Sequence, residues 1–315
     1  MSMSKPRIGI IGAGMAGLAC ARSLAASGVS PTLLDKGRGV GGRLATRRAP
    51  GGLSFDHGAQ YVTARSDGFI ATLNSLCDNG EAAEWVMEGQ TAFTGVPSMN
   101  ALAKALAEGL DIRRETKADR IEAHGNGWTV FAGSDSFVFD VLIVTAPAPQ
   151  TVDLLGGDHP LARQIAHVRL LPCWTLMAAF TQPPDVTWAS RRDPSGVLAW
   201  ISREASKPGR ADTAAFVAQA SPEWSKDHLD HDRADVETLL LKALSDTLSV
   251  DPGSAHHAAA HRWLYAKTET PLGSPFLNNA EATLYFGGDW CLGARVEAAW
   301  QSGTAIAEDV LRQLA

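Results

Sequence analysis

Glycines are the residues whose spacing points most directly to chemistry in this chain. The segment Gly12-Ala13-Gly14-Met15-Ala16-Gly17 follows an apolar run, Arg7 to Ile11, and leads into residues 15–25, whose apolar side chains recur at helical spacing. In such a strand, turn and helix, the first glycine permits the tight turn, the second lets a pyrophosphate approach the backbone, and the third lets helix and strand pack closely. The phosphates then face unpaired amides at the positive end of the helix. The segment therefore predicts a dinucleotide-binding turn.

An acidic residue at the end of the next apolar run supports this interpretation. Residues 31–35, Pro-Thr-Leu-Leu-Asp, predict a second strand that ends in Asp35. An acid about twenty residues beyond the glycine turn accepts hydrogen bonds from ribose hydroxyls. The order of strand, helix and strand is the opening unit of a doubly wound sheet, so we expect an α/β (α+β) protein with a Rossmann-like domain.

Two further glycine clusters indicate which dinucleotide is bound. Lys36-Gly-Arg38-Gly-Val-Gly41-Gly42-Arg43 offers additional amides and a guanidinium to a pyrophosphate, although a flexible glycine loop with exposed arginines is the alternative. Near the C-terminus, Gly287-Gly288-Asp289 ends an expected strand before a helix from about Val296 to Leu314. Its carboxylate can reach a ribityl hydroxyl, and the helix start can face the flavin N1 and C2 carbonyl, where negative charge collects on reduction. Together the clusters predict noncovalently bound FAD and redox chemistry.

Chain length predicts two domains, because 315 residues exceed what a single core usually organises. We expect residues 1–66, 97–150 and 276–315 to form a discontinuous FAD-binding domain. Residues 67–96 and 151–275 are expected to form a substrate-binding domain with a mixed sheet. Alternation in residues 128–131 and the apolar run 138–144 predict a strand pair that returns to the cofactor sheet. Met99 to Leu110 has one apolar helical face.

Composition excludes several classes of protein. A net charge of −6 argues against a nucleic-acid surface. The sequence has no run of about 20 apolar residues, so we expect no membrane anchor. The apolar N-terminal residues fit a strand and turn better than a signal peptide. The four scattered cysteines form no C-x-x-C pair and suit a reducing cytoplasm, so we expect a cytoplasmic protein with no obligate protein partner.

The sequence gives little support for a metal site or a catalytic nucleophile. His256, His257 and His261 have the spacing of metal ligands on a helix, but no carboxylate or cysteine completes the set. The acidic residues 227–232 precede a helical pattern and are better explained as a capping, solvated stretch. Cys291 has no obvious activating base, and no G-x-S-x-G segment occurs. We expect neither a metal site nor nucleophilic catalysis.

Longer stretches carry a family resemblance. They are Asp35 to Arg43, Phe55 to Tyr61 with Thr63 to Arg65, Ile201 to Arg210, Ala220 to Ser225, His261 to Tyr265 and Gly288 to Trp300. Together they resemble bacterial members of the renalase family, within the flavin-containing amine oxidase superfamily. The stretches extend over almost the whole chain and include the expected second domain.

The resemblance implies an FAD-dependent oxidase. Its substrates would be the 2- and 6-dihydro isomers of NAD(P)H, which give up a hydride to become NAD(P)+, while O2 is reduced to H2O2. Because hydride loss makes the dihydropyridine ring aromatic, no general base is required. Catalysis then depends on holding the ring against flavin N5 and on stabilising charge at N1.

The resemblance also implies site residues. Arg43 would lie at the pyrophosphate, the backbone around Ala118 at the adenine, and Val296 near the flavin carbonyl. The expected cofactor-binding set is Gly12, Ala13, Gly14, Met15, Ala16, Gly17, Asp35, Lys36, Gly41, Gly42, Arg43, Gln60, Tyr61, Ala118, Gly288, Asp289, Arg295 and Val296. The expected catalytic and substrate-holding set is Gln60, Tyr61, His261, Trp290 and Arg295.

Arg295 marks a departure from the amine oxidases. Those enzymes typically place one wall of an aromatic cage two residues before the glutamate that opens the C-terminal helix, and here that position is Arg295, before Val296 and Glu297. An arginine cannot form an aromatic slot for a neutral amine, and it repels an ammonium while attracting an anion. The alternative is an arginine that points to solvent.

Two other functions stay open at the level of sequence. One is an amine oxidase or a desaturase-type oxidoreductase that acts on an amine or an apolar substrate. The other is a flavin-binding sensor without turnover.

Overall fold

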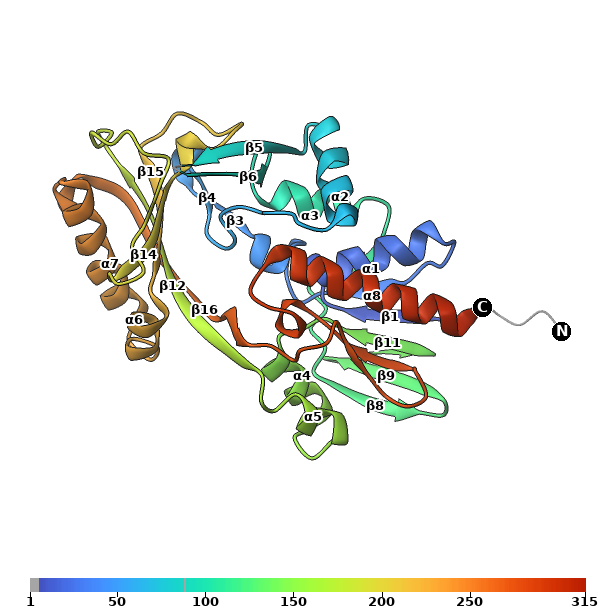
Figure 1. The fold of residues 1–315 in the computed structure, drawn as a ribbon. Helices are drawn as coiled ribbons and strands as arrows, with labels where there is room; N and C mark the ends of the chain where they lie inside the picture. Colours follow the sequence, from blue (N-terminus) through green and yellow to red (C-terminus); the bar gives the residue numbers. More distant parts are fainter. Residues whose placement is uncertain (1–5, 88) are drawn as a thin grey trace. The chain divides into compact units, whose positions relative to one another are not determined.

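The chain folds into two compact units in the computed structural model, which describes residues 6–87 and 89–315 (Figure 1). Unit 1 contains the described residues of Met1–Gly42 together with Ala103–Arg169 and Thr268–Ala315. Unit 2 contains the described residues of Arg43–Leu102 together with Leu170–Lys267. Both units are therefore assembled from segments that lie far apart in the sequence.

A six-stranded sheet forms the centre of unit 1. Its strands, in spatial order, are β17 (Leu277–Asn278), β18 (Leu284–Phe286), β11 (Val141–Val144), β1 (Ile8–Ile11), β2 (Thr32–Leu34) and β7 (Asp111–Arg113). The neighbours from β18 to β7 pair in parallel, and only β17 is antiparallel. All residues of β1 and β11 are buried, as expected for parallel strands covered on both faces. The predicted Rossmann-like α/β fold is confirmed.

Helices α1 (Met15–Ala26) and α8 (Val296–Leu314) pack against each other in unit 1 (Figure 1). A Cβ on Gly303 of α8 would lie 2.0 Å from the carbonyl oxygen of Ala16 in α1, so this close approach requires glycine. Both helices begin at the residues expected from their apolar periodicity. The C-terminal helix, about 280 residues beyond α1 in the chain, thus forms part of the same layer.

The predicted strand pair at residues 128–144 is wrong in part. β9 (Gly127–Ala132) pairs with β8 (Arg120–His124) and β10 (Asp135–Phe139) in a separate three-stranded sheet, and only β11 joins the central sheet. The apolar run divides at Asp140, whose carboxylate accepts hydrogen bonds from the Arg7 amide at 2.8 Å and its guanidinium at 3.0 Å. Two short helices, α4 (Ala148–Leu155) and α5 (Pro160–Gln164), follow.

Unit 2 is built on a five-stranded sheet. Its strands, in spatial order, are β13 (Ser190–Arg192), β14 (Leu198–Arg203), β15 (Ala215–Ala220), β12 (Arg169–Phe180) and β16 (Ala255–Thr270). Helices α6 (Pro222–Asp227) and α7 (Arg233–Leu248) follow β15. One face of β12, including Leu176 and Phe180, packs in a core with Leu240 and Leu244 of α7. Asp232 caps α7 by accepting a hydrogen bond from the Ala234 amide at 2.7 Å, which confirms the capping interpretation of that acidic stretch.

The other face of the unit 2 sheet is covered by a hairpin that the sequence analysis assigned to the cofactor domain. β3 (Thr46–Arg48) and β4 (Ser54–Asp56) form this hairpin, and Leu53 and Phe55 pack with Met177, Ala179 and Val217. This apolar burial places residues 43–66 in unit 2. Residues 97–102 also belong to unit 2, whereas 151–169 and 268–275 belong to unit 1.

The remaining helices and strands lie outside the two large sheets. In unit 2, α2 (Asp67–Asp78) precedes a second hairpin, β5 (Ala82–Met87) and β6 (Gln90–Gly95), which lies in a segment where the sequence has no clean periodicity. Helix α3 (Asn100–Ala107) extends from unit 2 into unit 1. Short 3-10 turns occur at Gly42–Leu44, Pro50–Gly52, Glu204–Ser206, Pro252–Ser254 and Asp289–Cys291.

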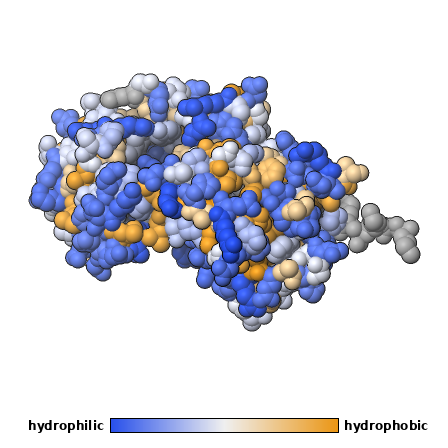
Figure 2. Space-filling view, turned by 60° about the horizontal axis from the view of Figure 1, so that its bottom comes forward, coloured by the Kyte–Doolittle hydropathy of each residue, from blue (hydrophilic) through white to orange (hydrophobic). Residues whose placement is uncertain are grey.

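The described residues include no helix long and apolar enough to cross a membrane. Large apolar side chains that are exposed, such as Val86 and Leu264, are few among the described residues. On the face drawn in Figure 2, hydrophilic and hydrophobic residues are interspersed.

Candidate functional site

The glycine turn of unit 1 has the geometry that its sequence predicts. Gly12 has a φ of +104°, which favours glycine, and a Cβ on Gly17 would lie 1.9 Å from the Gly12 carbonyl oxygen. Gly14 differs, because a Cβ there would meet nothing within 4 Å. Its backbone is therefore open to a ligand, as the second glycine of such a turn should be.

The start of α1 offers amides to an anion. No acidic residue lies in its first turn, and among residues 6–87 and 89–315 no side chain caps it, so the amides of Met15, Ala16 and Gly17 have no acceptor within the helix and no capping oxygen there. Aligned first-turn amides and the helix dipole attract a phosphate at this position. The structure thus fits the pyrophosphate of a dinucleotide.

The second glycine cluster lies directly beside the first. The Gly41 amide donates to the Ala13 carbonyl at 2.8 Å, and Gly14 and Gly41 form an isolated parallel bridge. The position of a Cβ on Gly42 is 3.6 Å from the Gly14 Cα. Two segments about 27 residues apart are therefore joined backbone to backbone around the same turn.

Asp35 forms hydrogen bonds with the glycine turn and with the second glycine cluster. Its carboxylate accepts hydrogen bonds from the amides of Ala13 at 2.6 Å and Gly37 at 2.7 Å. A carboxylate has about four acceptor positions, so further positions remain for a ribose. The next residue, Lys36, is exposed and donates to Gln150 at 3.3 Å.

The loop that contains Ala118 lies against the same segment. The Thr116 amide donates to the Asp35 carbonyl at 2.9 Å, and the Glu115 amide donates to the Gly37 carbonyl at 3.0 Å. Ala118, the residue expected at the adenine, comes two residues after Thr116, whose amide contacts Asp35, the residue expected at the ribose. Its contact with adenine remains a prediction.

The third glycine cluster is also in unit 1. The Gly287 amide donates to Val144 of the neighbouring strand β11, and the Gly288 amide donates to the Ser302 hydroxyl at 2.9 Å. Asp289 is buried, and one carboxylate oxygen accepts from Thr268 at 3.4 Å. The structure therefore brings all three clusters into one unit.

Trp290 and Arg295 have different surroundings. The Trp290 side chain is fully buried and its Nε1 donates to the Ala146 carbonyl at 3.0 Å, which is the environment of a core residue. Arg295 is the residue before Val296, the first of α8, and is partly exposed. Within the described part of the chain, its guanidinium makes no hydrogen bond or ion pair. Burial raises the pKa of the nearby Cys291 thiol to about 12, which does not suit a nucleophile.

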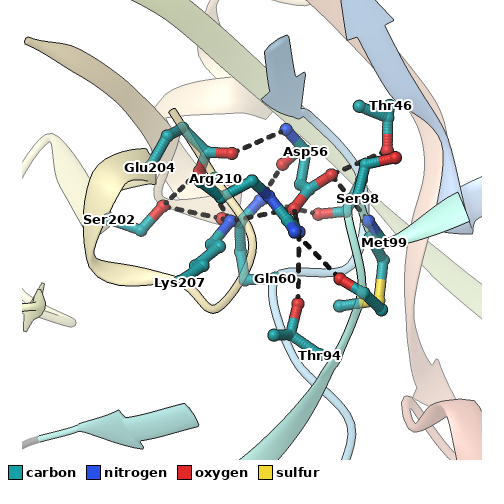
Figure 3. A network of polar contacts seen from close by, with 12 residues as sticks. Thr46, Asp56, Gln60, Thr94, Ser98, Met99, Ser202, Glu204, Lys207 and Arg210 are labelled. Carbon is teal, nitrogen blue, oxygen red and sulfur yellow. Dashed lines mark hydrogen bonds and ion pairs between the residues drawn. The ribbon is translucent and has the colours of Figure 1, made fainter. Parts of the chain in front are cut away.

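Unit 2 contains a buried network of charged groups (Figure 3). Lys207 contacts Glu204 at 2.6 Å and Asp56 at 3.3 Å, and Arg210 also pairs with Asp56. All four side chains are almost entirely buried. The network contains two cations and two carboxylates, so its formal charges cancel, as buried charges require.

The cations determine the ionisation of Asp56. Burial opposes the charged form of this carboxyl, but Lys207 and Arg210 outweigh it and lower its pKa to about 2. Asp56 also accepts hydrogen bonds from the Thr46 hydroxyl at 2.7 Å and the Met99 amide at 2.9 Å. Burial instead raises the pKa of Glu204. Asp56 is therefore the central anion of the network.

Gln60 belongs to this network. Its amide nitrogen donates to the carbonyls of Asp56 and Gly58, and its oxygen accepts from Ser202 at 2.8 Å and Lys207 at 3.2 Å. These bonds use both amide hydrogens and fix the course of residues 56–60. The expected contact of Gln60 with flavin or substrate remains a prediction.

Tyr61 and Arg43 make contacts within unit 2. The Tyr61 hydroxyl accepts from Arg192 at 2.7 Å, and its ring packs 5.4 Å from that of Trp200. The Arg43 guanidinium donates to the carbonyls of Tyr265 at 3.3 Å and Ala266 at 3.2 Å. Neither contact tests the cofactor role that the resemblance implies.

His261 lies in an aromatic cluster of unit 2. Its ring centroid is 4.9 Å from that of His57 and 4.5 Å from that of Trp263, and its Nδ1 is 3.5 Å from the Arg47 guanidinium. Burial and nearby positive groups lower the pKa of both histidines to about 4. Both rings are therefore neutral at pH 7. The histidines at 256, 257 and 261 lie on strand β16, not on a helix, and the described residues include no group that could hold a metal ion.

Comparison with protein families identifies the class. A model of NAD(P)-binding Rossmann-like domains matches residues 10–75, and a model of flavin containing amine oxidoreductases matches residues 66–311. The second match covers most of the chain. The protein belongs to the flavin containing amine oxidoreductase family. It is a flavin-dependent oxidoreductase, and its cofactor is FAD.

Solved structures share the fold of this amine oxidoreductase. A putative protoporphyrinogen oxidase from Exiguobacterium sp. 255-15 matches with a TM-score of 0.79 and 15% identity, over 99% of this chain and 100% of the other. Putrescine oxidase bound to putrescine matches at 0.75 and 14%, over 98% and 99%. Cyclohexylamine oxidase from Brevibacterium oxydans IH-35A matches at 0.74 and 14%, over 99% and 100%. At these identities the likeness shows the fold alone.

The sequence does not reveal how the charged residues of unit 2 combine in this amine oxidoreductase. Asp56, Glu204, Lys207 and Arg210 all occur in the stretches that carry the family resemblance, but no role was expected for any of them. The available signal was only the presence of charged residues in those stretches, which are otherwise rich in polar residues and glycine. Charged residues are almost never buried unless paired, so their pairing could not be read without the fold.

Proposed function

We propose that this protein oxidises the 2- and 6-dihydro isomers of NAD(P)H. In the balanced reaction, the dihydropyridine loses a hydride, and O2 with one proton accepts the two electrons to give NAD(P)+ and H2O2. FAD would supply the hydride acceptor and the route of the electrons to O2, and the glycine turn, the first-turn amides of α1 and Asp35 would hold it. The family membership supports a flavin oxidoreductase, and the resemblance of the unit 2 stretches supports the substrate.

The observation that carries the proposal is Arg295 at the start of α8. Its guanidinium has no partner within the described residues, and it stands where amine oxidases typically place an aromatic wall. A positive group there disfavours an ammonium substrate and favours an anionic dinucleotide. The isomers fit this charge because their diphosphate is negative.

The remaining residues of unit 1 have separable roles in this proposal. The glycine turn and the first-turn amides of α1 hold the pyrophosphate of the cofactor, and Asp35 orients the ribose. The start of α8 offers its positive dipole end to charge that develops nearby. None of these groups must remove a proton from the substrate, because hydride loss alone makes the ring aromatic.

Oxygen consumption and peroxide release with a panel of substrates test the proposal. We expect turnover with 2- and 6-dihydro NAD(P), little with ordinary 4-dihydro NADH, and little with putrescine or cyclohexylamine. Arg295→Gln should lower kcat/KM for the isomers roughly 10- to 100-fold, because a hydrogen bond to a charged group contributes about 1.5–3 kcal/mol. Arg312→Gln, at the other end of α8 and exposed, is the matched control.

An amine oxidase is the second candidate, because putrescine oxidase and cyclohexylamine oxidase share the fold. It predicts faster peroxide release with an amine than with any dihydro isomer. It also predicts that Arg295→Gln raises amine turnover by removing a repulsive charge. A flavin-binding sensor predicts no multiple turnovers with either class of substrate.

A further inference from the structure

Thr145 of unit 1 has no role in the chemistry described above. It follows Val144, the last residue of β11, and so lies at the carboxyl end of the strand that pairs with β1. Its hydroxyl donates to the carbonyls of Ile11 at 2.9 Å and Gly12 at 3.2 Å. A side chain 134 residues later in the chain than Ile11 therefore contacts the start of the glycine turn directly.

The hydroxyl contacts are not needed to pair the two strands. The Thr145 amide already donates to the Ile11 carbonyl at 2.8 Å, which continues the parallel pairing of β1 with β11. Backbone bonds of this kind hold parallel strands together. The contact from the hydroxyl to Gly12 is additional, and it concerns the turn rather than the sheet.

The space around the hydroxyl accounts for part of the glycine pattern. A Cβ on Gly12 would lie 2.6 Å from the Thr145 hydroxyl oxygen, and a Cβ on Gly17 would lie 3.0 Å from it. Protein interiors are close-packed, so neither position has room for a side chain while the hydroxyl is present. The hydroxyl and these two glycines therefore fit together as one packed group.

The peptide between Gly12 and Ala13 shows what the hydroxyl does. In a trans peptide the carbonyl and the amide point in opposite directions. Here the carbonyl accepts from the Thr145 hydroxyl, and the amide donates to the Asp35 carboxylate at 2.6 Å. Because glycine restricts its own backbone little, contacts of this kind must set the orientation of the peptide. Thr145 and Asp35 hold it from its two opposite sides.

We propose that Thr145 positions the turn that binds the diphosphate of FAD. Its hydroxyl keeps the Gly12 carbonyl oxygen, whose partial negative charge would repel a phosphate, directed toward Thr145. The turn then presents amides to the diphosphate. Thr145 acts through the turn, so it is a positioning residue and not a catalytic one. The inference rests on FAD as the cofactor and is independent of the substrate.

Phosphorus NMR of the FAD-loaded protein gives a readout at the diphosphate itself. Thr145→Ala and Thr145→Val remove the hydroxyl, and Thr145→Ser retains it. We expect the diphosphate resonances of bound FAD to shift in the first two variants and to keep their wild-type positions in the third. The matched control is Thr151→Val, which removes a buried hydroxyl that donates to the Ala146 carbonyl at 3.2 Å in unit 1. Unmoved resonances in both Thr145→Ala and Thr145→Val would overturn the inference, as would an equal shift in Thr151→Val.

Serial dilution of the loaded protein, followed by the fluorescence of released FAD, measures the affinity. The dissociation constant should rise about 10-fold or more in Thr145→Ala and Thr145→Val, and stay within about threefold of the wild type in Thr145→Ser and Thr151→Val. Thermal unfolding of the same four proteins measures the loss of stability. If the affinity falls in all four in proportion to that loss, the hydroxyl supports the fold alone and the inference is wrong. Either result leaves the proposed substrate untouched, because turnover of the dihydro isomers per bound FAD tests it separately.

Discussion

The glycine turn of unit 1 and the charge network of unit 2 are held in place by different kinds of contact. The turn is built from backbone, with Gly12, Gly14 and Gly17 leaving space for a ligand or for a neighbouring carbonyl. The network is built from side chains, with Lys207 and Arg210 joined to Asp56 across about 150 residues of chain. A ligand-binding turn can thus form from residues close together in the sequence, whereas the residues that support the 56–60 loop come from distant parts of the chain.

Removing one charge from the network should have the largest effect on stability. Among the described residues, Lys207→Met leaves Glu204 without an ion-pair partner and Asp56 with Arg210 alone, and breaking a buried ion pair costs about 3–5 kcal/mol. Urea unfolding followed by tryptophan fluorescence measures the loss. The double variant Lys207→Met with Glu204→Gln removes one charge of each sign and should recover part of it. A loss below about 1 kcal/mol in the single variant would show that the network is not a support.

Lowering the pH should have the second-largest effect on stability, and this effect should arise in unit 2. Burial first, then His261 and Arg47, lower the pKa of His57 to about 4, so the folded state disfavours the charged ring. The stability contributed by the neutral form is complete above about pH 6.5 and is lost as pH falls from 6.5 towards 4. Because His57 is 6% exposed, the loss can approach about 3 kcal/mol.

Unfolding free energies across pH 7 to 4 check this expectation. His57→Gln should reduce the dependence, with the part due to His261 remaining, whereas His124→Gln, at an exposed position of unit 1, should leave it unchanged. An equal slope in the wild type and the His57→Gln protein would contradict the assignment of this pH dependence to unit 2.

Adding a methyl group to the glycine turn should give an intermediate effect on stability. In Gly17→Ala the new Cβ would lie 1.9 Å from the Gly12 carbonyl, and such overpacking costs about 1–3 kcal/mol. Gly14→Ala introduces no clash, so it should change stability little and act mainly on FAD. Thermal unfolding and the flavin absorbance of the purified variants distinguish the two. The turn would not be the cofactor cradle if Gly14→Ala retained FAD with unchanged affinity.

A surface ion pair should give the smallest effect. Lys242 and Asp246 lie four residues apart on α7 at 2.7 Å, and both side chains are exposed. Asp246→Asn should change the unfolding free energy by about 0.5 kcal/mol or less, since exposed pairs contribute little. A loss comparable with that of Lys207→Met would show that burial is not what distinguishes the network.

The same contrast explains what the sequence could predict. Helix α8, the turn at Gly12 and the parallel strands depend on local periodicity and on glycine positions, so they were predicted closely. The strand pair at 128–144 was misassigned because the side chain of Asp140 divides an apolar run by bonding to Arg7, far away in sequence. Residues 43–66 join unit 2 because Phe55 packs against strands more than 100 residues later. Gln60 was singled out from its neighbours, but its partners Ser202 and Lys207 required the fold.

Anaerobic rapid mixing of the FAD-loaded protein with each dihydro isomer tests the central claim most directly. The loss of flavin absorbance reports hydride transfer without interference from oxygen. We predict that the 2- and 6-dihydro forms of NAD(P) bleach the flavin at least about 100-fold faster than ordinary 4-dihydro NADH, a difference of roughly 3 kcal/mol in the barrier. Bleaching by the 2- and 6-forms that is no faster than by the 4-form would contradict the account.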